Sequence, residues 1–358
     1  MKKKYIIILV FVFIAAALIS YNKFTSDSKN NSDFAETNST KIPEVNEKNI
    51  LVFIPGSIAG SAPYENLNNG ALEYADENEN INVKSYEAGF NQAEWESQLT
   101  SLVASGKYDI VLTTNPSLPE ICDNISKKFP NQKFIITDAY LDGNKSIKTY
   151  EYNQYQQSVI LGYLAGLITT SNMKNVNSDK KVGFILSQEY PMINDNVIPG
   201  FKEGLKQVDT DITADIRVIG NWYDASKASE LALSMIDNGV DTFTSIAGGA
   251  AEGLYKVASE KNLYVVAYDT NSYLLAPGAI VGSGNVKSTK LVKEALKESA
   301  NGELTWGAAE RVGIEQGYID FFTEDPLFKQ GLSDDVYSSF MDWYKKVKNG
   351  TITIKKNN

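Results

Sequence analysis

The sequence predicts an α/β protein made of two doubly wound, Rossmann-like lobes, with a ligand cleft between them. From Asn49 onward, short apolar runs rich in Val, Ile and Phe alternate with amphipathic helical stretches. The apolar runs are nearly continuous, which is typical of strands that are buried on both faces of a parallel sheet. The strand and helix units are too many for one open sheet, and 358 residues exceed the usual size of a single core.

Seven apolar runs are predicted as buried strands: ILVFIPG, YDIVLTTN, KFIITDA, KVGFILS, DIRVIG, DTFTSIAGG and LYVVAYD. Between two of them, residues 225–238 are predicted as a helix, because five apolar residues recur on one helical face: Ala228, Leu231, Ala232, Met235 and Ile236. Near the end of the chain we expect a helix that stops at Asn349 and Gly350, followed by a short strand.

The predicted strands divide between two lobes. We expect residues 49–153 and 269–315 to form the first lobe, and residues 154–268 and 316–358 to form the second. Ligands of open parallel sheets bind beyond the carboxyl ends of the strands, so the residues that follow each strand are the candidate site.

The composition excludes several classes of function. With 34 basic and 44 acidic residues the net charge is −10, which argues against a nucleic-acid partner. The absence of histidine removes the commonest general base and metal ligand, and a single cysteine, Cys122, excludes a thiolate cluster. Because no carboxylates cluster closely at a strand end, we expect neither an enzyme nor a bound metal or cofactor.

The amino terminus predicts a location outside the cytoplasmic membrane. Residues 1–21 are expected to be a signal or anchor segment, with Lys2–Lys4 followed by an apolar run. Leu18-Ile19-Ser20 is similar to a lipoprotein signal box, but Tyr21 stands where the acylated cysteine belongs. The segment therefore either stays as an uncleaved anchor on the outer face or is cut at an unplaced site. Residues 22–48, rich in Ser, Asn, Thr and charge, are predicted to be a flexible linker.

The residues that follow the predicted strands are chemically alike. They are aromatic, acidic or amide side chains and a paired glycine, and the candidates for ligand binding are Tyr64, Asn66, Asn115, Asp138, Trp222, Gly248, Gly249, Asp269 and Lys287. Aromatic rings stack on a flat heterocycle, carboxylates accept hydrogen bonds from sugar hydroxyls, and glycine allows close approach. The loop AGGAAEG lacks both the P-loop and the dinucleotide-binding patterns, so a phosphate is not expected there.

Each of these residues also has a purely structural interpretation. Gly248 and Gly249 could serve only tight strand–helix packing, and Trp222 could be a core or lobe-interface residue. Asp269 could cap the turn that follows it. Lys287 begins a helix, where the dipole does not favour lysine, which indicates a specific partner.

Six segments of the chain carry a family resemblance: LGYLAGLITT (161–170), KVGFILSQEYP (181–191), PGFKEGLKQV (199–208), VIGNWYDASKASELALSMIDNGVD (218–241), IAGGAAEGLYKVASEKNLYVVAYDTN (246–271) and IVGSGNVKSTKLV (280–292). In these segments the chain resembles the basic membrane protein (Bmp, PnrA-like) family of ABC-transporter substrate-binding proteins. That family includes purine-nucleoside receptors and relatives assigned to riboflavin uptake.

The resemblance implies a type I periplasmic-binding-protein architecture that closes on a ligand and delivers it to a membrane permease. It also implies that Asp269 binds ribose hydroxyls, that Lys287 lies near the same sugar, and that Gly248 and Gly249 form the loop beside it. Trp222 would be one aromatic wall for the base. In the first lobe, Tyr64 is our candidate for the second wall, and Asn66 or Glu65 for a polar contact. We expect a monomer that binds a purine nucleoside.

Departures from the family pattern keep other ligands open. The stretch GSIAGSAPYENLNNG replaces a pattern in which Asp is followed by Ser-Phe-Asn, and Gln156 and Gln157 lie near a position where the family commonly has Glu. The alternatives are a receptor for riboflavin or another heterocycle, and a membrane-anchored ligand sensor or regulator of the same fold.

Overall fold

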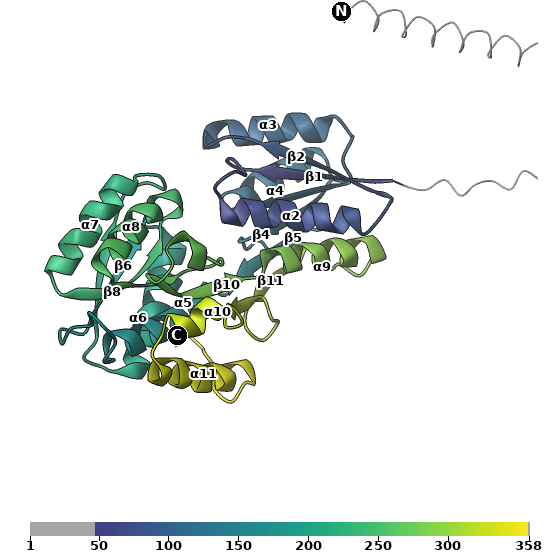
Figure 1. The fold of residues 1–358 in the computed structure, drawn as a ribbon. Coiled ribbons are helices and arrows are strands. Elements are labelled where there is room, and N and C mark those ends of the chain that lie inside the picture. Colours follow the sequence, from purple (N-terminus) through teal and green to yellow (C-terminus); the bar gives the residue numbers. More distant parts are fainter. Residues whose placement is uncertain (1–46, 357–358) are drawn as a thin grey trace, which may run out of the picture. The chain divides into compact units, whose positions relative to one another are not determined.

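The computed structural model describes residues 47–356 (Figure 1). The predicted anchor (1–21) and residues 22–46 of the predicted linker lie outside this range. Lys48, the last residue of the predicted linker, already belongs to the first strand. Within the described range, no helix has the length and apolar character needed to cross a membrane.

The first sheet has six parallel strands in the order β11-β5-β4-β3-β1-β2. In chain order these strands are β1 (Lys48–Ile54), β2 (Ile81–Glu87), β3 (Ile110–Thr114), β4 (Lys133–Thr137), β5 (Ile147–Tyr152) and β11 (Ala309–Val312). Helices α2 (Ala62–Asp76) and α9 (Ser288–Asn301) pack together, as do α3 (Gln92–Ala104) and α4 (Leu118–Lys128) (Figure 1).

The alternation of strand β1 explains the two helical layers of the first lobe. Ile50, Val52 and Ile54 belong to the buried cluster that contains α2 and α9, whereas Leu51 and Phe53 pack with α3 and α4. Successive side chains point to opposite faces of a sheet, so a continuous apolar strand requires cover on both sides.

The second sheet has the order β12-β10-β9-β8-β6-β7, and only β12 runs antiparallel to its neighbour. Its strands are β6 (Lys181–Leu186), β7 (Thr213–Val218), β8 (Val240–Ile246), β9 (Tyr264–Ala267), β10 (Ile280–Val286) and β12 (Ile319–Phe321). Its helices are α5 (Gln154–Thr169), α6 (Ile198–Val208), α7 (Ala225–Asp237), α8 (Ala251–Lys261), α10 (Pro326–Gln330) and α11 (Asp334–Lys348).

Both sheets follow one winding pattern, which confirms the predicted fold class. The first begins β2-β1-β3-β4-β5 and the second β7-β6-β8-β9-β10. In each sheet the chain places its second strand on one side of its first strand and all later strands on the other side, so the winding direction reverses once. All seven predicted strands form, and helix α7 buries Ala228, Ala232 and Met235 on its predicted apolar face.

The sheet order corrects two expectations. Strand β10 pairs with β9 in the second sheet, although residues 269–315 were assigned to the first lobe. The chain returns only after β10, where α9 packs on α2. The reason is packing: a β-carbon on Gly282 would lie 2.5 Å from Leu164 of α5, so the glycine allows β10 to pack closely against that helix.

The second corrected expectation concerns the end of the chain. Helix α11 ends at Lys348 as expected, but residues 351–356 form no strand.

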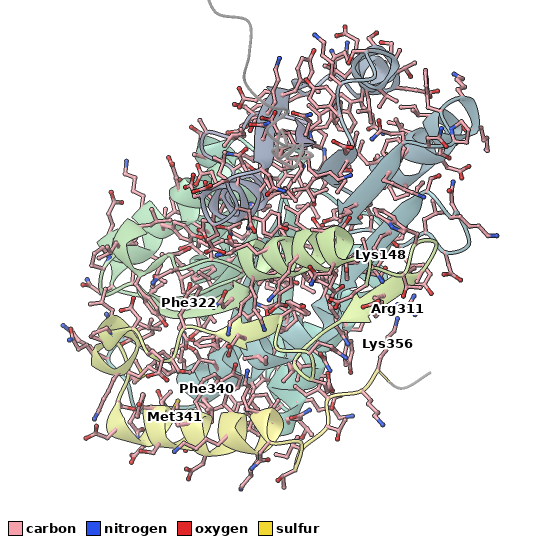
Figure 2. All side chains as sticks on the ribbon, turned by 90° about the vertical axis from the view of Figure 1, so that its right-hand side faces the viewer. Lys148, Arg311, Phe322, Phe340, Met341 and Lys356 are labelled. Carbon is pink, nitrogen blue, oxygen red and sulfur yellow. The ribbon has the colours of Figure 1, made fainter. Side chains whose placement is uncertain are left out.

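A buried lysine explains how the polar strand β5 enters the first sheet. Lys148 is 1% exposed, yet its ammonium is paired with Glu310 of β11 and lies 4.8 Å from the ring centre of Tyr150. The neighbouring Arg311 of β11 is bonded to Glu151 at 2.5 Å. Lys148 and Arg311 are labelled in Figure 2. Charged pairs of this kind allow β5 and β11 to lie side by side, although neither strand is a continuous run of apolar residues.

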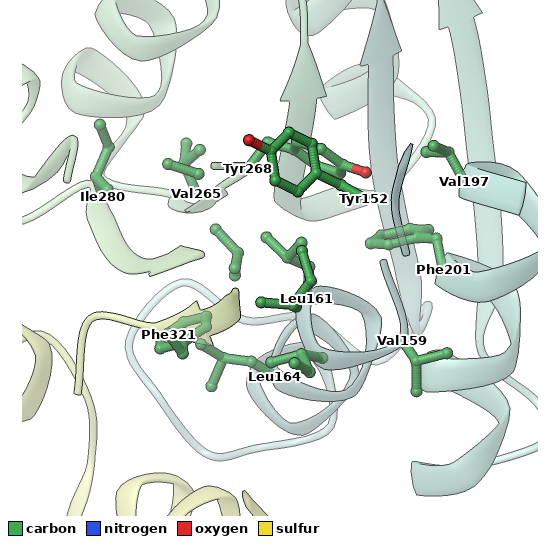
Figure 3. Packing of buried hydrophobic residues seen from close by; sticks show 14 of the residues in the cluster. Tyr152, Val159, Leu161, Leu164, Val197, Phe201, Val265, Tyr268, Ile280 and Phe321 are labelled. Carbon is green, nitrogen blue, oxygen red and sulfur yellow. The ribbon is translucent and has the colours of Figure 1, made fainter. Parts of the chain in front are cut away.

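Helix α5 is the centre of the second lobe's core. Its Leu161 and Leu164 pack among Val265, Ile280 and Phe321 of the sheet (Figure 3). On its other side α5 meets α6 through glycines, because a β-carbon on Gly162 or Gly204 would overlap the backbone oxygen of Phe201 or Val159. The two helix backbones are therefore in direct contact.

This contact predicts that Gly162→Ala destabilises the protein by about 1–3 kcal/mol, since the obstacle is backbone and cannot rotate away. Gly166→Ala on the same helix is the matched control, because its new methyl group would meet side chains and no backbone, Val208 at 3.1 Å and Ile212 at 3.3 Å. Denaturant unfolding of both variants measures the difference. Equal stability of the two variants would contradict the close backbone contact.

Candidate functional site

Four of the candidate residues lie where the winding of each sheet reverses. Asn115 and Tyr64 follow β3 and β1, the two strands at the reversal of the first sheet. Gly248 and Gly249 follow β8, which pairs with β6 at the reversal of the second sheet. Loops on either side of such a reversal separate, which leaves space for a ligand at the carboxyl edge.

Three of the predicted residues come together in the first lobe. Tyr64 lies in the first turn of α2 and donates a hydrogen bond to the Pro55 carbonyl at 3.0 Å. Burial raises the pKa of Tyr64, the Asn115 amide lowers it, and the charge of Asp138 raises it further. Asn115 and Asp138 both have positive φ, 110° and 54°, a backbone conformation that Asn and Asp adopt more readily than most other residues.

Asp138 is a carboxyl group in an environment that disfavours its charge. Removal from water raises its pKa to about 7, a hydrogen bond from Gln154 opposes this, and the charges of Asp269 and Glu151 add to it. The Gln154 amide nitrogen lies 3.1 Å from Oδ1 of Asp138. At neutral pH the group therefore exchanges between carboxylate and neutral acid.

Asp269 is the corresponding carboxyl group of the second lobe. It follows β9, and burial raises its pKa to about 6. Its backbone carbonyl accepts a hydrogen bond from Val286 at 3.0 Å, which joins the ends of β9 and β10. Burial and then the charges of Asp138 and Asp269 raise the pKa of Tyr190, after β6, to about 12. This phenol therefore lies near both carboxyl groups.

A hydrogen-bond chain links the two lobes at this point. Gln154 donates to Asp138 and accepts from the Tyr268 hydroxyl at 2.8 Å, and that hydroxyl lies 3.3 Å from Ser158. Tyr268 directly precedes Asp269. The first residue of α5 thus connects the end of β4 in one sheet with the end of β9 in the other.

Trp222, Gly248 and Gly249 form a second group. Gly248 has φ +53°, and a β-carbon there would lie 3.2 Å from the Trp222 carbonyl and 3.3 Å from its ring. The Trp222 carbonyl accepts a hydrogen bond from Ala250 at 3.1 Å. The glycine loop therefore approaches the backbone and ring of Trp222, whose side chain stays 41% exposed.

Tyr255 connects this group with the carboxyl groups. It lies on α8 and packs against the small cluster of Ala228, Ala247, Ala250 and Ala251 beside the glycine loop. Burial raises the pKa of Tyr255 to about 12, Ser245 lowers it, and the charge of Asp269 raises it.

Asn66 and Lys287 line a cavity of about 780 Å³ together with Asp269. Within it, the ammonium of Lys287 is paired with Asp320 of β12, and Asp320 also contacts the Tyr344 hydroxyl at 2.5 Å and Lys348 at 3.2 Å. Burial raises the pKa of Asp320, but Lys287, Tyr344 and Lys348 together hold it below its ordinary value. Lys287 thus already has a carboxylate partner, which it shares with Lys348. The backbone oxygen of Asn66 accepts a hydrogen bond from Thr289 at 3.1 Å.

The remaining chemistry of the described residues is structural. Cys122 is fully buried in the first lobe, and burial raises the pKa of its thiol, so it stays protonated. Residues 47–356 contain no group of three or more carboxylates, histidines or cysteines able to hold a metal ion.

Sequence reasoning missed Gln154, Tyr190, Tyr255 and Tyr268 as site residues. Tyr190 lies at the end of the predicted strand KVGFILS and could have been included by the strand-end rule. Gln154 and Tyr255 belong to helices, and their places near the carboxyl groups depend on how these helices pack.

The comparisons agree on one family. The profile described as Bmp, ABC transporter substrate-binding protein PnrA-like, matches residues 47–358. The chain is 23% identical over 290 residues to the CD4+ T-cell-stimulating antigen of Listeria monocytogenes, covering 75% of this chain and 76% of the relative. It is 24% identical to the ABC transporter nucleoside-binding protein BmpA of Lactococcus lactis, covering 66% and 67%.

Solved structures show the same fold. An ABC transporter solute-binding protein of Aeropyrum pernix superimposes with a TM-score of 0.74 at 18% identity, covering 87% of this chain and 94% of that one. A transcriptional activator of the comK gene from Bacillus halodurans superimposes with a TM-score of 0.70 at 17% identity, covering 86% and 99%. These similarities confirm the type I periplasmic-binding-protein architecture.

The raised pKa of Asp138 gives a prediction for stability. A carboxyl group whose pKa is higher in the folded than in the unfolded state destabilises the fold above its folded pKa, and the penalty disappears as the pH falls from about 7 toward 4. Asp138→Asn keeps the oxygen that accepts from Gln154 but cannot ionise. We expect it to raise Tm at pH 8 by roughly 2–4 °C. The gain should shrink at pH 5, and a thermal scan that shows a loss at pH 8 would contradict it.

Proposed function

The chain belongs to the Bmp family of PnrA-like ABC transporter substrate-binding proteins, and on this premise we propose that its own ligand is a nucleoside, with a purine nucleoside favoured. A protein of this family binds a small molecule outside the cytoplasm and presents it to a permease; it is not an enzyme. The proposal concerns the ligand and the residues that bind it.

The observation that carries the proposal is the pair of carboxyl groups, Asp138 and Asp269, from opposite sheets. Burial raises the pKa of both groups, and the charge of Asp269 raises that of Asp138. Their neighbours Gln154, Tyr190 and Tyr268 are neutral polar side chains. Partly desolvated acceptors of this kind favour a ligand that donates several hydrogen bonds, as the hydroxyl groups of a ribose do.

The charge of the site favours a nucleoside over a nucleotide. Three lysines line the cavity with Asp269, and each already has a carboxylate partner. Lys287 is paired with Asp320, Lys290 with Glu294, and Lys293 with Glu73 and Glu77. A phosphate group would meet two carboxyl groups without an uncommitted lysine among these partners, and such like-charge contacts are costly.

In our proposal the ribose hydroxyls bind Asp269 beside the loop of Gly248 and Gly249, with Lys287 and Asn66 at the edge of the cavity. The base lies between Tyr64 and Trp222, and Asn115 and Asp138 contact its polar edge. Closure of the lobes is favoured only to the extent that the ligand contacts both at once. A relative from Lactococcus lactis, named a nucleoside-binding protein, supports this ligand class.

We also propose that the protein acts as a monomer with an ABC permease as its partner. Its amino-terminal segment would hold it on the outer face of the membrane. Lys2–Lys4 and the apolar run after them support this orientation, because basic residues stay on the cytoplasmic side.

Two alternatives remain testable. A riboflavin or other heterocycle receptor would use the same aromatic residues with a different polar edge. A membrane-anchored sensor is favoured by the structural similarity to a transcriptional activator, since the fold serves a regulatory protein there.

The first experiment is calorimetric titration of residues 47–358 with adenosine, guanosine, inosine, uridine and riboflavin. We expect a nucleoside to bind, and Asp269→Asn to weaken binding by about tenfold or more, because a carboxylate acceptor is lost. Asp237→Asn, an exposed carboxylate at the end of α7, is the matched control and should bind as the wild type does. Binding of riboflavin alone would overturn the nucleoside proposal, and unaltered binding in Asp269→Asn would remove Asp269 from the site.

Binding should also depend on pH in a defined direction. Asp269 accepts two hydrogen bonds only when ionised, and its pKa is about 6 in the free protein. We expect Kd to rise by about tenfold between pH 8 and pH 5, because most Asp269 is then protonated before the ligand binds. Titration of Asp138→Asn over the same range separates the two carboxyl groups. Tighter binding at pH 5 would contradict this role of Asp269.

A further inference from the structure

An exposed aromatic side chain, Phe90, lies on the loop that follows strand β2. It is 79% exposed, whereas most large apolar side chains of the first lobe are buried. The loop itself is held in place by three hydrogen bonds: Ala88 donates to Ile54 at 2.8 Å, Gly89 donates to Gly56 at 3.1 Å, and the Trp95 indole donates to Gly89 at 2.8 Å. A well-anchored loop thus presents an apolar ring to solvent.

The ring of Phe90 lies beside Tyr64, over the backbone of Gly56. A β-carbon on Gly56 would lie 3.1 Å from Cε1 of Phe90 and 2.7 Å from Cε2 of Tyr64. Glycine at this position therefore allows both rings to approach the end of β1. Phe90 therefore lies beside Tyr64, whose own neighbours include Asn115 and Asp138.

The two rings differ in how far they are already engaged. Tyr64 is partly buried, and its hydroxyl is bonded to the Pro55 carbonyl. Phe90 has no polar group and keeps most of its surface in water. Covering that surface with a flat ligand ring is favourable, and aromatic pairs gain further from stacked or edge contacts.

We propose that Phe90 is the main ring-contacting residue of the first lobe and that it selects ligands with a flat aromatic ring system, with Tyr64 as its support. This inference rests on the proposed function. It assigns the main ring contact of the first lobe to the loop after β2, whereas the sequence analysis assigns that contact to Tyr64.

Exposed apolar side chains also occur on other loops, so exposure alone does not make Phe90 a ligand contact. Tyr223, Leu274 and Leu275 are 81%, 80% and 67% exposed at other strand ends. Phe90 differs from Tyr223 and Leu274 because its ring lies beside the candidate residue Tyr64. Leu275 lines the cavity with Asp269, but it carries no aromatic ring.

The test is calorimetric titration of Phe90→Ala, Phe90→Leu and Phe90→Trp with adenosine and riboflavin, using the one that the wild type binds. We expect Phe90→Ala to weaken binding by about tenfold or more, as loss of a base-stacking ring does. Phe90→Leu should also weaken it, because the apolar volume remains but the ring is lost, and Phe90→Trp should retain binding with fluorescence that changes on addition of ligand. Leu72→Ala, an exposed apolar residue of α2, is the control and should bind normally.

The outcomes separate the two proposals. If the wild type binds none of the nucleosides titrated above and no riboflavin, the proposed function fails and this inference falls with it. If the wild type binds but Phe90→Ala and Phe90→Leu bind equally well, only the role of Phe90 is overturned. Normal binding by Phe90→Ala combined with reduced uptake in cells would instead make Phe90 a contact for the permease, which also overturns the inference. Unchanged Tm values verify that the variants are folded.

Discussion

The hydrogen-bond chain from Asp138 through Gln154 to Tyr268 is the contact on which the candidate site depends. Gln154 is the first residue of α5, and α5 packs on the second sheet through Leu161 and Leu164 and on α6 through Gly162. The same helix therefore builds the second lobe's core and holds the ends of β4 and β9 near each other. Tyr268, at the end of β9, directly precedes Asp269, so this chain also places the second carboxyl group.

The electrostatics of the site follow from this placement. Two carboxyl groups lie near each other without an uncommitted cation among their hydrogen-bond partners, and burial raises the pKa of both. Lys287 could have balanced them, but it is paired with Asp320 of β12, where Tyr344 and Lys348 also bind. The free site thus retains unused acceptor capacity, which a ligand rich in donors can satisfy. In our proposal, aromatic rings on both lobes complete this candidate site for a neutral, flat and hydroxylated molecule.

Much of the fold could be predicted because the buried strands are continuous apolar runs, and the strand-end rule then indicated Asn115, Asp138, Gly248 and Asp269. Strands β2 and β5 were missed for a physical reason. β2 is an edge strand with few buried residues, and β5 contains Lys148, whose burial requires Glu310 from a strand about 160 residues later. Strand β10 is not among the seven predicted strands, and its residues were expected in the first lobe, whereas it pairs with β9 in the second sheet and its Gly282 packs against α5.

The sequence by itself determined the alternation of strands and helices, the absence of histidine chemistry, and the family to which residues 47–358 belong. These properties are local or compositional, so they can be read without knowing which segments meet. Which strand ends and side chains lie close together follows only from the tertiary structure. Gln154 joins Asp138 to Tyr268 by hydrogen bonds. Lys287 is paired with Asp320, and Phe90 lies beside Tyr64. Such contacts connect residues far apart in the chain, and their energies depend on burial and geometry that exist only after folding.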